Sequence, residues 1–446
     1  MRHAAMRRVR LVLLFGTVIA ASALPRAERM GYPPEEFAAR RQQLVKVLQH
    51  GTLLMFGATS PTPGARFRQD NDFYYLTGNE SLNAALVMDV PSGAAHLFLP
   101  KLSQTEIRYE GGNWLEEAGA AAKYGFASIQ PLSTLHEFLA RRRGIAGAGQ
   151  LWTRLSERDV VNASRIDTAI GTARRLSNPF AQHPTEDAAR VATLREQFPY
   201  YELKDVSPHL DRLRMIKSPR EIEILRYNGR ISAEALERAI QATAPGKYEY
   251  ELEAEATYWM LKNGFQGAAY PAIVGSGPMG NQWHYEANGR RMQAGELVVM
   301  DYGGSLDYLT IDITRTWPVS GRFTDAQLKA YECVLEAQKA IIAAIKPGVE
   351  RSVVRKIAAD VFRTHGFDPR YSYLGHYVGM SVHDVGDWEL PFEAGMVMAI
   401  EPIIDMPGLH VRIEDTVLVT PTGAEVLTSA VPKEAEEVLA LLRQAR

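Results

Sequence analysis

The chain has 446 residues, of which 23% are charged and 46% hydrophobic, and its formal net charge at pH 7 is −2. This length suits two domains rather than one core, and the near-neutral charge argues against nucleic acid as a partner. The single cysteine, Cys333, excludes an intramolecular disulfide. Because Cys333 lies in the helical pattern LKAYECVLEAQKAIIAAI, we predict that it packs in a core.

The N-terminal residues have the composition of a targeting segment. The basic stretch MRHAAMRRVR is followed by the apolar stretch LVLLFGTVIA and by the small residues Ala21-Ser22-Ala23. This order is typical of a signal peptide, so we predict that residues 1–23 are removed and that the protein is secreted or periplasmic. An uncleaved anchor is the alternative, although the apolar run is short for a membrane span. We expect no stable membrane insertion once the signal is removed.

The next part of the chain is predicted to be a mixed α/β domain over residues 31–205. EEFAARRQQLVKVL has the pattern of an amphipathic helix, and TLLMFGA, AALVMDV and AAHLFLP have the pattern of short strands. A polar, helix-rich stretch follows over 154–212. Ser218, Pro219 and Glu221 then form a capping box with proline at the first helical position, which indicates a new element. We place the domain boundary just before it and assign residues 206–446 to the second domain.

The second domain is predicted to be α+β with an antiparallel sheet. Its glycine-bounded strands alternate with long amphipathic helices, which are expected over 218–243, 248–263, 324–346 and 350–365. GSGPMG at 275–280 matches a dinucleotide-binding pattern, but Pro278 and the following NQWHYE do not open a helix. We therefore reject dinucleotide binding.

Two aspartates end apolar runs in VVMDYGGSLDYLTIDITRTWPV, residues 298–319. If the runs pair as an antiparallel hairpin about residues 304–307, Asp301 lies opposite Asp312 on one face. Like charges about 5 Å apart repel, so this arrangement requires a proton or a cation between the carboxylates. In the alternative interpretation, Asp312 forms a salt bridge with Arg315 and the remaining groups are solvated.

A second hairpin carries two glutamates. In VMAIEPIIDMPGLHVRIEDTVLV, Glu401 and Glu414 lie symmetrically about the turn Pro407-Gly408. Strand alternation places Arg412 on the same face as Glu414, so we predict that Arg412 orients this glutamate. The two hairpins together present two facing pairs of acids.

Three histidines are further candidates. His376 and His383 lie between the hairpins in the glycine-rich stretch YLGHYVGMSVHDVG, and His284 lies in GNQWHYEANG. Taken singly, each histidine is more often an ordinary core or surface residue than a functional one, but the glycines allow close backbone approach.

Four carboxylates and an imidazole can hold two divalent cations about 3.5 to 4 Å apart with a shared water. The oxygen-rich set favours Mn²⁺, with Co²⁺, Zn²⁺ or Fe²⁺ also possible. The bridging hydroxide that such a site generates near neutral pH predicts amide hydrolysis.

Several segments resemble one peptidase family in their order and spacing. They are IVGSG with His284, MDYGG, DITRTWPVSG, LGHYVGMSVHDVG, AIEP and RIED. This set resembles the M24 "pita-bread" metallopeptidases, and the aminopeptidase P group most closely. FRQDNDFYYLTG resembles the N-terminal domain of that group, so the resemblance covers nearly everything after the signal.

The resemblance implies a role for each candidate residue. Asp301 would bind one ion, His376 and Glu401 would bind the other, and Asp312 and Glu414 would bridge the two. Glu401 would also take the proton of the attacking water, while His284 and His383 would hold the substrate carbonyl and stabilise the tetrahedral intermediate. A homodimer or homotetramer is also implied, in which the N-terminal domain helps to close a neighbour's pocket.

We therefore expect an exopeptidase that hydrolyses the N-terminal Xaa-Pro bond of peptides. An Xaa-Pro dipeptidase is the main alternative. A non-catalytic pita-bread protein and a creatinase-like enzyme are disfavoured because all five ligands are present, and methionine aminopeptidase is disfavoured by the long N-terminal domain. Ser372 departs from the family pattern, which has a histidine four residues before the metal-binding one, so substrate preference or efficiency is in question.

Overall fold

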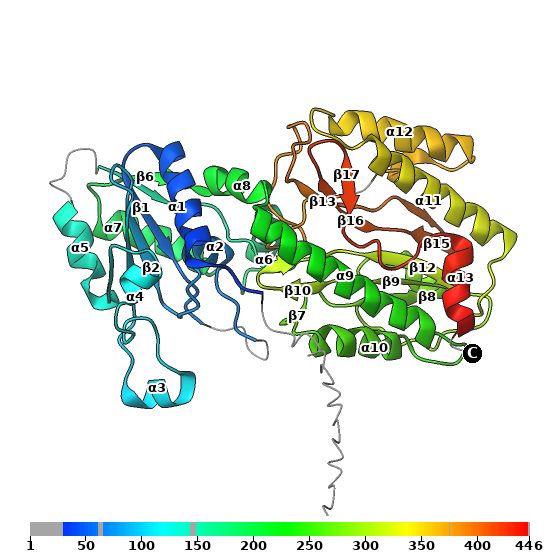
Figure 1. The fold of residues 1–446 in the computed structure, drawn as a ribbon, viewed down its shortest axis with the longest axis horizontal. Helices are drawn as coiled ribbons and strands as arrows, with labels where there is room; N and C mark the ends of the chain where they lie inside the picture. Colours follow the sequence, from blue (N-terminus) through cyan, green and yellow to red (C-terminus); the bar gives the residue numbers. More distant parts are fainter. Residues whose placement is uncertain (1–29, 61–65, 143–148, 374, 445–446) are drawn as a thin grey trace, which may run out of the picture.

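The computed structural model describes residues 30–60, 66–142, 149–373 and 375–444, which form two domains side by side (Figure 1). The predicted signal segment, residues 1–23, lies outside the described residues, so secretion stays a prediction. Among the described residues, no helix is both long enough and apolar enough to cross a bilayer.

The N-terminal domain is built on a six-stranded sheet in the order β4-β3-β2-β1-β5-β6. Strands β1 to β3 pair antiparallel and the outer strands add in parallel. The strands are β1 Thr52–Phe56, β2 Ala85–Asp89, β3 Ala94–Leu99, β4 Ser128–Pro131, β5 Gln150–Thr153 and β6 Glu202–Asp205. The three predicted strands are β1, β2 and β3, and the mixed α/β prediction is confirmed.

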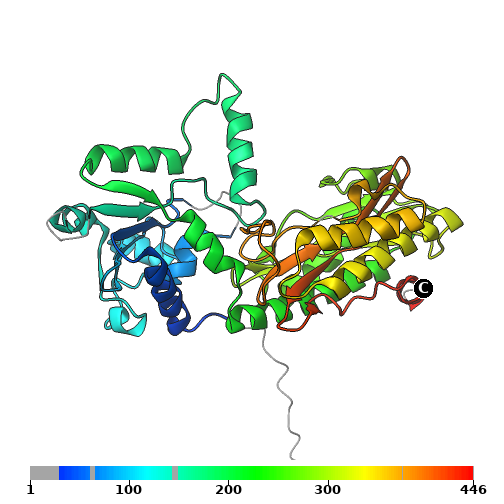
Figure 2. The same cartoon turned by 90° about the horizontal axis from the view of Figure 1, so that it is seen from above.

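Most helices of this domain pack around the sheet. Two do not: α3 lies away from the sheet and buries no residue (Figure 1), and α6 stands out from the body on the side of the C-terminal domain (Figure 2). They are α1 Pro34–Leu48, α2 Asn71–Thr77, α3 Gln104–Glu110, α4 Ala120–Lys123, α5 Leu135–Arg142, α6 Arg165–Leu176 and α7 Glu186–Gln197, with a 3₁₀ turn at Leu132–Thr134. The predicted first helix is α1, which buries Phe37, Leu44 and Leu48.

The C-terminal domain has two helix pairs that flank antiparallel strands, the pita-bread arrangement (Figure 1). Its helices are α9 Pro219–Ala242, α10 Glu249–Lys262, α11 Asp325–Ala344, α12 Arg351–Thr364 and α13 Ala435–Gln444, and α8 Ser207–Met215 leads into it. The four predicted helices are α9 to α12. The predicted capping box is present at α9, where the Ser218 Oγ accepts from the Glu221 amide. Cys333 is buried in α11, as predicted.

The strands of this domain form four small antiparallel sheets, in the orders β11-β10-β7, β12-β9-β8, β13-β16-β17 and β14-β15. They are β7 Gly267–Ala268, β8 Ile273–Ser276, β9 Leu297–Asp301, β10 Gly304–Leu306, β11 Leu309–Thr310, β12 Thr314–Pro318, β13 Val397–Ile400, β14 Ile403–Met406, β15 Leu409–Arg412, β16 Asp415–Val419 and β17 Ala424–Val426. GSGPMG leads into a 3₁₀ turn at Gly277–Asn281, so it opens no α-helix; a second 3₁₀ turn spans Pro369–Tyr371.

The register of the first hairpin differs from the prediction. Asp301 lies opposite Thr314, not opposite Asp312. The turn falls on Asp307 and Tyr308, both left-handed with φ of 46° and 68°, as a two-residue type I′ turn requires. Because the pairing moves by two residues, Asp301 and Asp312 still share one face of the hairpin as diagonal neighbours.

The second hairpin has the predicted register. The β13–β16 and β14–β15 pairs continue one pairing pattern, which places Glu401 opposite Glu414. The alternative salt bridge between Asp312 and Arg315 is wrong, because the buried Arg315 guanidinium instead contacts Asp415 at 2.8 Å. Asp312 is therefore left to face the other acids.

A group of buried ions, here called the junction cluster, joins the two domains. Arg214 is 1% exposed and its guanidinium contacts three aspartates at 2.7 to 2.8 Å. The cluster consists of Asp72, Asp159, Asp384, Arg154, Arg165 and Arg214. Asp384 directly follows His383, so the cluster fixes the loop that carries the predicted active-site histidines.

Candidate active site

Three of the predicted metal ligands meet at one point. One ligand atom each from Asp312, His376 and Glu414 lies within 4.8 Å of the others. His376 Nε2 is 3.3 Å from an Asp312 oxygen and 3.6 Å from Glu401 Oε1. Thr416 on β16 donates its hydroxyl to the Asp312 carbonyl and accepts from the Asp312 amide, which fixes the backbone at this residue.

The remaining predicted ligand, Asp301, is tied to this group by two side chains. The Tyr270 hydroxyl hydrogen-bonds to the carboxylates of Asp301 and Asp312. Arg412 Nη2 donates to Asp301 Oδ2 at 2.7 Å, and its Nη1 lies 3.8 Å from Glu401. All five predicted ligands thus gather in one group, which we call the acidic site; Asp301, Asp312 and Glu414 are buried, whereas His376 and Glu401 are partly exposed.

The predicted partner of Glu414 is wrong. The hydrogen bond to Glu414 Oε2 comes from the Thr314 hydroxyl at 2.6 Å, whereas Arg412 reaches Asp301 on the other hairpin. Alternation along one strand could not show this, because it depends on how the two hairpins pack: the Glu414 amide donates to the Thr314 carbonyl between them.

A glycine lets the His376 loop approach β13. A side chain at Gly375 would place its Cβ 2.5 Å from the Ala399 carbonyl oxygen, which forces a glycine here. The Ala399 amide then donates to the His376 carbonyl at 2.9 Å. His376 Nδ1 donates to the Tyr377 carbonyl, which leaves Nε2 to face the carboxylates in the tautomer that binds a metal.

The charges of the acidic site do not balance. Burial, together with the charge of Asp312, raises the pKa of Asp301 to about 8 even though Arg412 opposes this. Burial and the neighbouring acids raise the pKa of Glu414 well above its usual range, and burial raises that of Glu401. Burial opposes the charged form of His376, but Asp312 outweighs it and raises the histidine pKa to about 9. The site therefore lacks positive charge.

The residues present fit divalent cations. Glu414 Oε1 is buried without a hydrogen-bond partner among the described residues, although its other oxygen is bonded. A buried carboxylate oxygen without a partner is costly unless a cation or proton satisfies it. Carboxylate oxygens and one imidazole nitrogen form a ligand set suited to divalent metals.

The other predicted site residues lie around this group. The ring of His383 is 4.2 Å from that of His376, and its Nδ1 is 3.2 Å from Asp167 of α6. His284 is exposed, and its charge is one of those that oppose the rise that burial causes in the pKa of Glu401, so it lies within electrostatic reach of that carboxylate. Ser372 is buried at the end of the 3₁₀ turn.

Sequence reasoning missed Tyr270, Thr314 and Asp167. Tyr270 precedes a short strand and belongs to no motif that we singled out. Thr314 lies in the quoted segment DITRTWPVSG, but nothing in that segment marks it as a hydrogen-bond donor to Glu414. Asp167 lies 216 residues from His383 along the chain, so no local pattern could connect them.

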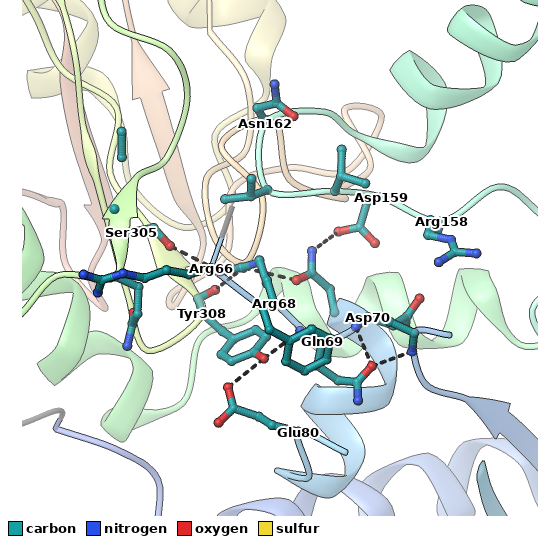
Figure 3. Close-up of a pocket in the computed structure, with 18 of the residues that line it drawn as sticks. Arg66, Arg68, Gln69, Asp70, Glu80, Arg158, Asp159, Asn162, Ser305 and Tyr308 are labelled. Carbon is teal, nitrogen blue, oxygen red and sulfur yellow. Dashed lines mark hydrogen bonds between the residues drawn. The ribbon is translucent and has the colours of Figure 1, made fainter. Parts of the chain in front are cut away.

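A cavity of about 560 Å³ lies between the domains beside the histidine loop (Figure 3). Arg68 donates from Nη2 to the Met380 carbonyl at 2.6 Å and to the Tyr308 carbonyl at 3.1 Å. Gln69, Asn162 and Ser305 also line this space. The five predicted ligands do not line the cavity, so it is distinct from the acidic site.

Comparisons with known proteins agree with this architecture. A family model described as "Metallopeptidase family M24" matches residues 223–421, and a model of the aminopeptidase P N-terminal domain matches residues 37–148. The chain is 31% identical over 459 residues to the Xaa-Pro aminopeptidase of Escherichia coli (strain K12), covering 92% of this chain and 98% of that protein. The chain belongs to metallopeptidase family M24, in the aminopeptidase P group.

A solved structure and an archaeal protein are also similar to this chain. The structure of E. coli aminopeptidase P with the inhibitor Pro-Leu matches with a TM-score of 0.77 and 30% identity, over 93% of this chain and 99% of that one. The Xaa-Pro dipeptidase of Pyrococcus furiosus is 37% identical over 244 residues, covering 53% of this chain and 70% of that protein. As an M24 metallopeptidase, the chain is a hydrolase that uses divalent metal ions.

Proposed function

We propose that this protein is an Xaa-Pro aminopeptidase, which hydrolyses the bond between an N-terminal residue and a proline in the second position of a peptide. The observation that carries the proposal is the extent of the likeness. The match to the E. coli aminopeptidase covers 92% of the chain, whereas the match to the archaeal dipeptidase covers 53%. Proline forms a tertiary amide without an N–H, which makes a dedicated peptidase chemically reasonable.

The acidic site supplies the metal ligands in this proposal. Asp301, His376, Glu401, Asp312 and Glu414 would hold the two cations, and Asp312 and Glu414 each have two carboxylate oxygens to contribute. Two divalent cations, with Mn²⁺ as the favoured metal, would lower the pKa of a shared water and polarise the scissile carbonyl. The buried Glu414 oxygen without a partner supports this ligand set.

The remaining residues orient groups and move protons. Glu401 lies beside His376 at the edge of the site, where it accepts the proton of the attacking water. His383 and His284 lie near His376 and Glu401, and they hold the substrate carbonyl and the negative charge that develops on its oxygen. Arg412 holds Asp301 through the 2.7 Å hydrogen bond.

An Xaa-Pro dipeptidase is the second candidate, supported by the 37% identity of the matched region to the archaeal enzyme. The two activities share a metal site and differ in whether the substrate continues beyond proline.

The test uses purified residues 30–446 with added Mn²⁺. Initial rates are compared for an Xaa-Pro-Xaa tripeptide, an Xaa-Pro dipeptide and a matched Xaa-Ala-Xaa tripeptide. The proposal predicts cleavage of the first substrate with a clear preference over the other two. Preference for the dipeptide would establish the second candidate, and cleavage of none of them would refute both.

The assembly state also stays a prediction. We propose a homodimer or homotetramer, supported by the resemblance to the aminopeptidase P group. Sedimentation equilibrium would give a mass two or four times that of the chain, and a monomer at micromolar concentration would contradict this.

A further inference from the structure

The loop that carries His383 is held by one segment of the N-terminal domain. Three consecutive loop residues each contact residues 159–167, which lead into α6. The contacts are Ser381 Oγ to Asp159 Oδ2 at 2.6 Å, the Val382 amide to the Val161 carbonyl at 2.8 Å, and His383 Nδ1 to Asp167 Oδ2 at 3.2 Å. The first two contacts fix the backbone and leave the third to set the ring.

Asp167 is itself held in place. It is the third residue of α6 and closes the capping box with Ser164, whose amide and hydroxyl donate to Asp167 Oδ2 at 3.0 and 2.7 Å. The same oxygen accepts from His383. The carboxylate is therefore oriented by its own helix before it meets the histidine.

A carboxylate can only accept hydrogen bonds, so His383 must carry its hydrogen on Nδ1 in this contact. The bond fixes both the tautomer and the ring orientation, and it turns Nε2 away from Asp167. The ring then lies beside His376, with centroids 4.2 Å apart.

We propose that Asp167 is a positioning residue for His383, supplied to the active site by the N-terminal domain. This inference rests on the proposed function, in which His383 holds the substrate carbonyl. Both side chains are partly exposed, at 43% and 38%. Exposed ion pairs add little to stability, so the contribution of Asp167 is to geometry.

Helix capping is the competing role for Asp167, and the chain offers a matched control. In α3, Ser103 and Glu106 form the same kind of capping box on the surface. Glu106→Ala removes the equivalent carboxylate without touching the active site.

The experiment compares Asp167→Ala, Asp167→Asn and Glu106→Ala in hydrolysis of an Xaa-Pro-Xaa tripeptide. We expect Asp167→Ala to lower kcat about 10- to 100-fold, with a smaller change in KM, because losing the hydrogen-bond partner that orients an active-site residue has effects of this size. Asp167→Asn should stay close to wild type, because the Ser164 donors select its amide oxygen for the same position. Glu106→Ala should leave kcat unchanged.

A second pair of variants asks whether Asp167 acts through His383. In a His383→Ala background, Asp167→Ala should cause no additional loss. Three results would overturn the proposal. The first is that Asp167→Ala lowers kcat as much in the His383→Ala background as in wild type. The others are an unchanged kcat in Asp167→Ala alone, or an Asp167→Asn variant as impaired as Asp167→Ala.

A readout independent of activity separates this inference from the proposed function. In metal-free protein labelled with ¹⁵N-histidine, the Nδ1 resonance of His383, identified by its absence in His383→Gln, should report a protonated Nδ1. Asp167→Ala should shift this resonance and Glu106→Ala should not. If the wild type cleaves none of the peptides, the proposed function fails while this shift still decides the positioning role. An identical spectrum in Asp167→Ala would refute that role.

Discussion

The junction cluster and the acidic site both bury several carboxylates, yet the pKa values of Asp72 and Asp159 fall in the first, whereas those of Asp301, Glu401 and Glu414 rise in the second. Asp312 is the exception in the acidic site: burial raises its pKa, but the neighbouring His376 outweighs this and lowers it. In the junction cluster, burial is outweighed by Arg165 and Arg214, so the pKa of Asp72 falls to about 2 and that of Asp159 falls well below its usual range. In the acidic site, burial raises the pKa of Asp301 to about 8.

The difference lies in the balance of charge. In the junction cluster Asp72, Asp159 and Asp384 each contact Arg214 at 2.7 to 2.8 Å, and Arg154, Arg165 and Lys217 add further cationic contacts to these aspartates. Arg154 also contacts Asp70 and Asp187, and Arg165 also contacts Asp211. The acidic site has one guanidinium and one imidazole for its four carboxylates, which are Asp301, Asp312, Glu401 and Glu414. Buried acids alone therefore do not mark a functional site. Surplus buried negative charge does, because it has to be met by protons or by metal ions.

The largest expected effect comes from removing one charge of the acidic site. Asp312→Asn should lower kcat/KM for an Xaa-Pro-Xaa peptide at least about 10³-fold, about 4 kcal/mol of transition-state stabilisation, because an amide cannot serve two cations. Asp360→Asn, which alters an exposed carboxylate on α12, is the control and should stay within twofold of wild type, on the order of 0.4 kcal/mol. Activity of Asp312→Asn within tenfold of wild type would remove this residue from the mechanism.

Breaking the junction cluster should instead destabilise the fold. Arg214→Met leaves buried aspartates unpaired, and we expect a loss of about 3 to 5 kcal/mol in the free energy of unfolding, measured with urea in metal-free protein. Arg226→Met, which breaks an exposed pair with Glu425, should cost no more than about 1 kcal/mol. Equal losses in the two variants would show that the junction cluster is not a special source of stability.

The two regions should also respond differently to pH. The folded state holds the protons of Asp301 and His376, with pKa near 8 and 9, more tightly than the unfolded chain does. Stability of metal-free protein should therefore fall as pH rises from about 4 to 9. The lowered pKa of Asp72 affects the stability of the fold only below about pH 4, where the stabilisation by this carboxylate is lost as pH falls.

Thermal unfolding at several pH values measures this dependence. Asp301→Asn should make the decline of Tm between pH 5 and 8 shallower, because it removes one of the protons that the folded state holds more tightly than the unfolded chain. A Tm that rises over this range in metal-free wild type would contradict the charge imbalance.

The smallest expected effect concerns the hydrogen bond that orients Glu414. Thr314→Val removes the donor at 2.6 Å while it keeps the side-chain volume, and should weaken Mn²⁺ binding about tenfold. Thr364→Val, on the exposed end of α12, should leave the Mn²⁺ dissociation constant unchanged. An unchanged constant in Thr314→Val would show that Glu414 is oriented without this threonine.

The sequence predicted the helices, the strands and the carboxylates of the acidic site better than it predicted the hydrogen-bond partners of these carboxylates. The register predicted for the second hairpin was correct because Pro407-Gly408 is a strong local turn signal. The register predicted for the first hairpin was wrong because its turn residues, Asp307 and Tyr308, carry no such signal, although their backbone is left-handed. Even this error kept both aspartates on one face, since strand side chains alternate with a period of two.

The partners depend on packing between distant segments. Thr314 meets Glu414 only because two hairpins lie edge to edge, and Asp167 meets His383 only because the domains dock. Periodicity within one element carries no information about such contacts. The ligand assignments came from the resemblance, and the metal count and the roles of the histidines stay predictions.

The central claim is that the surplus charge of the acidic site is met by two cations. Calorimetric titration of metal-free protein with Mn²⁺ at pH 8 tests it most directly, with Asp312→Asn as the comparison. We predict two ions per chain in wild type and fewer than two in the variant. Absence of Mn²⁺ binding by folded wild-type protein, or two ions bound equally well by Asp312→Asn, would contradict the account.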